Sequence, residues 1–375
     1  MKSRANAEPD ALRELKEFAL VHETPWPRDP AATPLPGQQP FGVHHEDPPP
    51  FDRPRGPLHL RGGPSGVVLQ GGRELVAWGE PDRADQTFSV AKTCLALLAG
   101  LAFTRGLLPD VHEPVVRRVP GIGFDSERHA QITWHHLLQQ TSEWEGQCFG
   151  LPDQVDRWRR VSMDPRPVSP EEKKGGARPL REPGTYWEYN DVRINQLSLA
   201  LLHLFGRPLP EVFAEALMQP LGATSRWRWE GYEDAWTTVA GRRVQSVPGG
   251  THWGAGISIS ARDLARLGQL LLDEGRCRVA GEERVLIAAD WVRRMREPCG
   301  IAPFYGYLVW LNRTGTLFPA ASPDAYAMLG AGGHLVLVEP ALQAVVVARW
   351  LDPADTAEFV ARAVAALKAL KAGAA

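Results

Sequence analysis

A nearly uninterrupted apolar run constrains the fold of this chain more than any other feature. It lies within "TFSVAKTCLALLAGLAF", residues 87–103, and carries no charged residue between Lys92 and Phe103. The run is too short for a membrane-spanning helix, which needs about 20 apolar residues. We therefore predict a buried helix that begins near Ser89 and ends near Gly106, a typical C-terminal capping residue.

The same segment opens with Ser-x-x-Lys, and the pattern has a chemical interpretation. Residues three apart on a helix share a face, so Ser89 and Lys92 are expected to be neighbours. A neutral lysine amine can accept the proton of a serine nucleophile, whereas arginine cannot, because it stays protonated in proteins. Lysine is also rare here, at seven of 42 basic residues. With 13 Ser and seven Lys in 375 residues, chance produces Ser-x-x-Lys in roughly one such chain in four. The motif alone therefore leaves open whether Ser89 is a nucleophile or only the first residue of a buried helix.

The remaining segments predict an α/β (α+β) fold in which an antiparallel sheet of about five or more strands is flanked by helices. "SGVVLQ" and "RELVAWG" flank Gly71-Gly72, which is typical of a hairpin. Three more strands are expected in "YGYLVWL", "HLVLVE" and "LQAVVVARW", followed by a helix over about 356–371. Ser260 is expected to cap another helix, with Asp263 completing a capping-box-like start.

The division into domains follows from where these patterns lie. Residues 1–60 are expected to form a short helix and an extended strap, because eleven prolines fall between Pro25 and Pro57. Residues 61–106 and 226–375 would build the α/β domain, and residues 107–225 a mostly helical inserted domain. The net charge of -2 and the polar N-terminus favour a cytoplasmic protein with no nucleic-acid or membrane partner.

Two further segments carry candidate chemistry. In "EPGTYWEYNDVRINQLSLALL", residues 182–202, the phenol of Tyr189 could move protons, although a buried structural tyrosine is the simpler interpretation. In "AMLGAGGHLVLVEP", residues 327–340, glycines run into a strand. A backbone amide there could complete an oxyanion hole opposite that of Ser89. A nucleotide-binding loop is disfavoured because such a loop follows a strand and opens a helix.

No cofactor or metal is expected from the sequence. His135-His136 and His334 lack a metal-binding spacing, and the four scattered cysteines favour free thiols. There is no Gly-x-Ser-x-Gly segment for an α/β-hydrolase triad. Among 13 tryptophans, Trp144, Trp253 and Trp310 are candidates for a pocket wall, although a core role is the simpler interpretation for each.

Taken together, residues 65–350 resemble the serine β-lactamase and penicillin-binding family. The similarity is greatest to its class C-like branch of D-alanyl carboxypeptidases, family VIII esterases and 6-aminohexanoate-dimer hydrolases. "TFSVAK" is similar to the Ser-x-x-Lys box and "PGTYWEYND" to the Pro-Gly-x-x-aromatic-x-Tyr-x-Asn segment. "ITWHHLLQQTSEWEG" and "GAGISISARDLARLGQLLLDEG" resemble two further family segments. Four ordered landmarks are far more specific than one short box.

The resemblance implies an active site between an antiparallel sheet and an inserted helical domain. Ser89 would be the acylated nucleophile, Lys92 its base and Tyr189 a proton-transfer partner. The backbone amides of Ser89 and Ala331 would hold the oxyanion. Substrate contacts are expected from Asp191, Gly332, Gly333 and Trp253.

Two departures from the family pattern bear on the substrate. Asp191 replaces the usual Asn and cannot donate an amide hydrogen bond, so we expect it to pair with Lys92 or Arg193 instead. The third motif usually carries a Lys or His that holds a substrate carboxylate, but here it reads "YAMLGAGG". This favours small esters or amides that lack that carboxylate.

The leading hypothesis is therefore a serine hydrolase, a carboxylesterase or amidase that works through an acyl-enzyme. A β-lactamase or D-alanyl-D-alanine carboxypeptidase is the alternative within the same fold. A non-catalytic binding protein is a third hypothesis, because a fold does not fix a function. The oligomeric state and the identity of the substrate are left open by the sequence.

Overall fold

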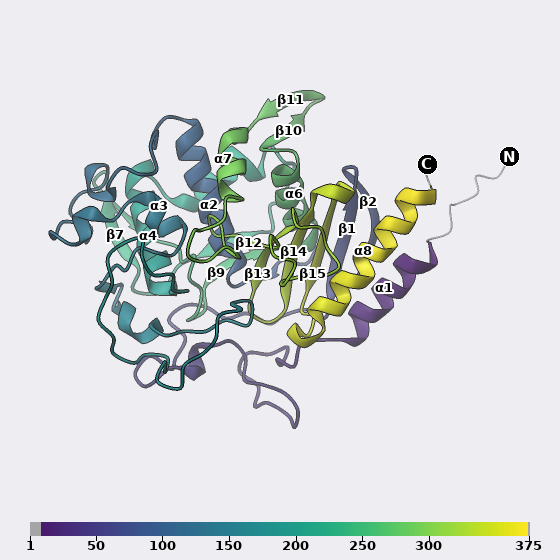
Figure 1. Ribbon diagram of the computed structural model, residues 1–375, viewed down its shortest axis with the longest axis horizontal. Coiled ribbons are helices and arrows are strands. Elements are labelled where there is room, and N and C mark those ends of the chain that lie inside the picture. Colours follow the sequence, from purple (N-terminus) through teal and green to yellow (C-terminus); the bar gives the residue numbers. More distant parts are fainter. Residues whose placement is uncertain (1–8, 374–375) are drawn as a thin grey trace.

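A six-stranded antiparallel sheet forms the centre of the computed structural model, which describes residues 9–373 (Figure 1). The strand order is β12-β13-β14-β15-β1-β2. Strands β1 and β2 come from near the start of the chain and the other four from its last quarter. The prediction that both ends of the chain build one antiparallel sheet is therefore confirmed. The strands are β1 (Ser65–Gln70), β2 (Arg73–Trp78), β12 (Trp310–Leu311), β13 (Tyr326–Gly330), β14 (His334–Glu339) and β15 (Ala344–Arg349).

The predicted hairpin between β1 and β2 is present. Gly71 and Gly72 form its turn with φ angles of 57° and 73°, a left-handed conformation that glycine adopts without the steric cost of a Cβ. Strands β14 and β15 are joined by a short turn over Pro340–Leu342. The alternation of side chains along β15 then sends Val345 and Val347 to one face of the sheet and Val346 to the other.

Helices cover both faces of this sheet. Helices α1 (Asp10–Val21) and α8 (Thr356–Gly373) lie side by side on the face that carries Val346 (Figure 1). Helix α6 (Ala261–Leu272) packs on the opposite face, where Gly268 allows close approach to Val345. Helix α2 (Val90–Thr104) is the predicted apolar helix, and every residue from Val90 to Ala102 is buried. It lies between the sheet and the middle of the chain.

The middle of the chain contains less regular structure than the sequence predicts. Helices α3 (Trp134–Leu138), α4 (Asp191–Phe205) and α5 (Leu209–Phe213) are present, but residues 157–190 form no helix or strand. A small sheet of β3 (Asp85–Gln86), β9 (Gly256–Ile259) and β6 (Arg228–Glu230) lies close to the start of α2. Further elements include hairpins β4 (Gln147–Cys148)–β5 (Leu151–Pro152), β7 (Trp236–Val239)–β8 (Arg242–Gln245) and β10 (Arg276–Val279)–β11 (Glu282–Val285), helix α7 (Ala289–Met295), and several short 3-10 or π-helical turns.

Two local predictions were wrong. The segment 305–311 is a strand only over Trp310–Leu311, because Leu308 has a left-handed φ of 55° that breaks an extended chain. Strand β13 was missing from the predicted strands, since its glycine-rich end obscures the alternation of a strand. The predicted helix cap at Ser260 is present, since the Ser260 side chain accepts a hydrogen bond from the Asp263 amide. The Asp263 carboxylate, however, binds Thr224 rather than closing a capping box.

Other expectations concern the thiols and membranes. The four cysteines are free, as predicted. Within residues 9–373 no helix combines the length and apolar character that crossing a bilayer requires. The division into domains stays a prediction.

Candidate active site

Ser89 lies at the N-terminus of α2, immediately after a tight turn. The preceding residue, Phe88, has a left-handed φ of 49°, which costs energy for a residue with a side chain. Thr87 fixes the turn to the small sheet, because its amide and its Oγ1 both donate to the carbonyl of Ile257, at 3.0 and 3.1 Å. The turn therefore holds the serine hydroxyl at the end of a helix that is anchored on both sides.

Lys92 meets Ser89 as their spacing predicts. Its Nζ donates to Ser89 Oγ at 2.9 Å, and its side chain is 1% exposed. The next residue, Thr93, donates to the carbonyl of Leu308 at 2.7 Å and fixes the rotation of this helical turn. A serine hydroxyl and a lysine amine are thus in hydrogen-bond contact, which is the geometry expected of a nucleophile and its base.

Asp191, the first residue of α4, lies against Lys92. Its Oδ1 is 2.7 Å from Lys92 Nζ and 3.0 Å from Arg159 Nη1. Burial by itself would raise the pKa of Asp191, but the nearby Arg159 and Lys92 cations outweigh it and hold that pKa well below its usual range. Of the two partners expected from the sequence, Lys92 is therefore the right one. Arg193 pairs instead with Glu143, Glu188 and Asp153.

Tyr189 is buried beside the same cation. Lys92 Nζ lies 4.5 Å from the centroid of its ring and the guanidinium carbon of Arg159 lies 5.2 Å from it. The ring stacks on Trp310 with centroids 5.7 Å apart. The structure thus brings together the serine, the lysine and the tyrosine singled out by the sequence.

A second layer of charged groups surrounds this cluster. His252 Nε2 lies 2.7 Å from Asp47 Oδ2, and Lys174 Nζ lies 2.6 Å from Asp47 Oδ1. The Asp156 carboxylate accepts a hydrogen bond from the Asp191 amide at 2.6 Å and forms an ion pair with Arg159 at 3.1 Å. Asp47 belongs to the Pro-rich strap, so the strap is tied to the site by buried charges.

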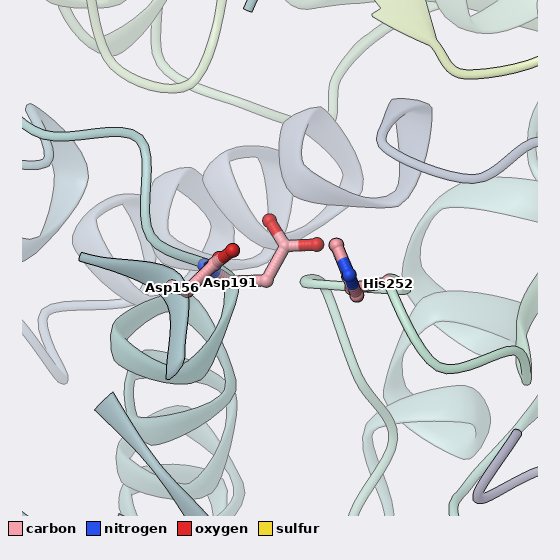
Figure 2. Close-up of side chains that lie close together, drawn as sticks. All are labelled: Asp156, Asp191 and His252. Carbon is pink, nitrogen blue, oxygen red and sulfur yellow. The ribbon is translucent and has the colours of Figure 1, made fainter. Parts of the chain in front are cut away.

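Three of these groups, Asp156, Asp191 and His252, lie close enough to hold a metal ion (Figure 2). The surrounding charges do not fit one. Lys92 and Arg159 already neutralise Asp191, and Arg159 also pairs with Asp156. A divalent ion would add uncompensated positive charge to a buried cluster, which is costly. We therefore interpret the trio as part of an ion-pair network.

Ser89 opens into a cavity of about 450 Å³. Its walls are mainly apolar. The apolar wall residues are Val43, Val161, Met163, Trp310, Leu329, Ala331, Leu335, Leu351 and Pro353. Two cations also line it, and both are engaged: Arg159 as above, and Arg160 with the carbonyls of Arg166 and Pro167 at 2.6 and 2.7 Å.

The glycine-rich turn between β13 and β14 forms part of the rim. Gly330, Ala331 and Gly333 line the cavity together with Ser89. Gly332 faces Trp26 and Trp350 instead, since a Cβ added to it would lie 2.8 and 2.9 Å from their rings. The oxyanion and substrate roles expected of these residues stay predictions.

Besides Gly332, two further expected substrate contacts, Trp253 and Asp191, do not line the cavity. Trp253 is completely buried and donates Nε1 to the carbonyl of Phe51 at 2.9 Å, so it belongs to the core. Asp191 is 1% exposed and faces Lys92 and Arg159 rather than the cavity. Trp310 does line the cavity, whereas Trp144 packs elsewhere, with Nε1 on the carbonyl of Gly123.

Arg159, His252 and the strap residues of the site were not predicted from the sequence. No periodic or spacing signal identifies them, because Arg159 lies in a segment without helix or strand and its partner Asp191 is 32 positions away. His334 also lines the cavity and is fully buried. Burial, with Arg349 and Arg61 nearby, keeps its pKa well below the usual histidine value.

The chain is similar to known proteins in its sequence family and in its fold. No curated protein gave a significant sequence match. Similar solved structures include a putative 6-aminohexanoate-dimer hydrolase from Bacillus anthracis, at 14% identity and TM-score 0.57, covering 82% of this chain and 80% of that one. A penicillin-binding protein homologue from Caulobacter crescentus has 15% identity and TM-score 0.57, covering 86% and 95%. EstCE1, a hydrolase with promiscuous acyltransferase activity, has 17% identity and TM-score 0.56, covering 81% and 93%.

These structural likenesses establish the β-lactamase-like fold. A sequence-family model makes the assignment specific, because it matches residues 60–371, most of the chain. The expected resemblance is thereby confirmed, and the chain belongs to the Beta-lactamase family.

Proposed function

We propose that this protein is a serine hydrolase that cleaves a neutral ester or amide through an acyl-enzyme on Ser89. The observation that carries the proposal is the 2.9 Å contact between Ser89 Oγ and Lys92 Nζ at the edge of a mainly apolar cavity. A buried lysine at the start of an apolar helix has a desolvation cost that catalysis would explain.

In the proposed reaction, Ser89 Oγ attacks the substrate carbonyl carbon while its proton passes to Lys92, once the Lys92 amine has released the proton that makes it a cation beside Asp191. The backbone amides of Ser89 and Ala331 would stabilise the oxyanion. Lys92, directly or through Tyr189, would then protonate the leaving alcohol or amine as its bond to the carbonyl carbon breaks. Water then attacks the acyl carbonyl carbon and gives a proton to Lys92, which passes it to Ser89 Oγ as the bond between Ser89 and the acyl carbon breaks. The carboxylic acid and free Ser89 are released.

The charges of the cavity support a substrate that lacks a carboxylate at the position where the family usually binds one. Both arginines of the cavity are engaged by protein partners, and the third-motif segment contributes Leu329, Gly330 and Ala331 rather than a cation. An anionic substrate group would lose its hydration there without gaining a free cation. The apolar walls suit an uncharged acyl or leaving group.

The experiment is labelling with a fluorophosphonate followed by peptide mass spectrometry, together with hydrolysis of p-nitrophenyl esters. We expect one adduct, on Ser89, and loss of at least about 1,000-fold of ester turnover in Ser89→Ala. An unlabelled Ser89 with full turnover by Ser89→Ala would rule the proposal out. Nitrocefin in the same assay tests the β-lactamase alternative, for which we expect slower turnover than for a neutral ester.

A further inference from the structure

Asp191 is held through its backbone and through two ion pairs of one carboxylate oxygen. Its backbone amide donates to Asp156 at 2.6 Å, and the side chain of the preceding Asn190 caps helix α4 by accepting from the Arg193 amide. Its Oδ1 is shared between Lys92 at 2.7 Å and Arg159 at 3.0 Å. A side chain held in this way has little freedom, so it can hold Lys92 in one position.

The groups that face Asp191 come from three parts of the chain besides α4. Lys92 comes from α2, Asp156 and Arg159 from the short 3-10 helix Asp153–Asp156 and the residues just after it, and His252 from the loop before β9. Asp47 and Lys174 face His252 from behind, and Figure 2 shows an Asp191 oxygen directed toward the His252 ring. The remaining titratable neighbours are Tyr189, Tyr232 and Tyr305. The three carboxylates of the cluster face three cations, in the pairs Lys92–Asp191, Arg159–Asp156 and Lys174–Asp47.

We propose that Asp191 is a positioning residue of the Ser89–Lys92 pair, which it completes as a third member. It holds Lys92 Nζ against Ser89 Oγ, and its negative charge acts on the proton transfer between them. The proposal rests on the proposed function and adds to it a carboxylate where the family usually carries an amide. The arrangement follows the general pattern in which a base is oriented by a third group.

Charge is what separates this role from a structural one. An asparagine at position 191 would fill the same space and could still accept a hydrogen bond from Lys92, but it would not stabilise an ammonium ion there. A carboxylate at 2.7 Å favours the charged form of a neighbouring amine. Removing the Asp191 carboxylate therefore favours the neutral form of the Lys92 amine. Arg159 is a second cation on the same Asp191 oxygen, so removing it favours the charged form of Lys92.

The test measures the rate at which a fluorophosphonate modifies Ser89 as a function of pH, with the site read by mass spectrometry. In Asp191→Asn we expect the acidic limb of this profile to move to lower pH by about 1–3 units. In Arg159→Gln we expect it to move to higher pH, by about one unit. Asp191→Glu, which restores the charge, should return the limb toward its wild-type position.

The same profile for kcat and KM of ester hydrolysis should show the effect of Asp191→Asn in kcat, since Asp191 does not line the cavity. A folded Asp191→Asn protein with the wild-type limb would overturn the inference while leaving the proposed function intact. If Asp191→Asn does not fold, Arg159→Gln decides: a limb at higher pH supports the inference and an unmoved limb overturns it. Wild-type protein whose Ser89 is never modified would overturn both proposals.

Discussion

Gly330 on strand β13 lies directly against Thr87, two residues before Ser89. A Cβ added to Gly330 would be 2.0 Å from the Thr87 carbonyl oxygen, well inside the distance that two such atoms tolerate. The edge of the large sheet and the turn that precedes Ser89 are therefore in backbone contact. This contact brings the glycine-rich turn to the rim of the cavity.

Gly330→Ala should separate these two segments. The added methyl group requires β13 or the turn at Thr87 to move, and a small misplacement of reacting groups is costly for catalysis. We expect kcat/KM for a p-nitrophenyl ester to fall by about 100-fold. Gly300→Ala is the matched control, because nothing lies within 4 Å of a Cβ at Gly300. Equal activities in the two variants would contradict the importance of this contact.

Leu329 precedes Gly330 and lines the cavity, so it is a position from which a cation could reach the substrate. Leu329→Lys should raise turnover of nitrocefin relative to a neutral ester by about 10-fold, because a free ammonium would then meet the substrate carboxylate. The measurement is the ratio of kcat/KM for the two substrates. Leu329→Met controls for the change of shape. A ratio that is the same in both variants would mean that the missing cation does not determine substrate choice.

The parts of the site that the sequence predicts depend on short spacings. Ser89 and Lys92 meet because residues three apart share a helical face, and Tyr189 was found through a local motif. The buried helix and the β1–β2 hairpin likewise follow from apolar runs and a Gly-Gly pair. Each of these features is specified within one segment of about 20 residues or fewer.

The features that were missed depend on contacts between distant segments. Arg159 reaches Asp191 from a stretch without helix or strand, and Asp47 reaches His252 across about 200 positions. Trp253 is an aromatic residue of the kind that often lines pockets, but its indole donates to the carbonyl of Phe51 in the core. Strand β13 ends in the glycine that its contact with Thr87 requires, and that glycine made it look like a loop. Local patterns carry no information on such pairings.

Glu143 gives a prediction about acid stability. It is completely buried and pairs with Arg178 at 2.6 Å and Arg193 at 2.8 Å. Burial alone would raise the pKa of Glu143, but these two arginines and the Arg181 amide lower it from 4.5 to about 2. The folded state therefore gains about 3 kcal/mol of stability above pH 4.5 from this group, and that contribution is lost as the pH falls toward about 2.

In Glu143→Gln this contribution should be missing at pH 7, and the free energy of unfolding should depend less on pH below 4.5. Urea unfolding at several pH values measures both effects. Glu358→Gln is the control, because Glu358 is exposed and pairs with Arg362 at the surface, where such a pair contributes about 0–1 kcal/mol. If the two variants lose equal stability at pH 7, the buried network does not stabilise the fold as we infer.

The last prediction concerns the Pro-rich strap, which lies outside the residues matched by the family model. Its Trp26 packs edge to face on Phe88, the residue before Ser89, with ring centroids 5.2 Å apart, and it also covers Gly332. Gln39, Val43 and Glu46 of the strap line the cavity itself. The strap is therefore a wall of the candidate site as well as an extended cover on the body.

Trp26→Ala should remove the support beneath the turn at Phe88. Large-to-small changes at a buried tryptophan cost about 3–5 kcal/mol, which urea unfolding measures. The strained φ of Phe88 depends on the packing around it, so we also expect kcat for ester hydrolysis to fall while KM changes less. Trp26→Phe keeps an aromatic ring against Phe88 and should retain most of both properties. A Trp26→Ala protein that loses stability but keeps the wild-type kcat would limit the strap to a structural role, because the position of Ser89 would then not depend on it.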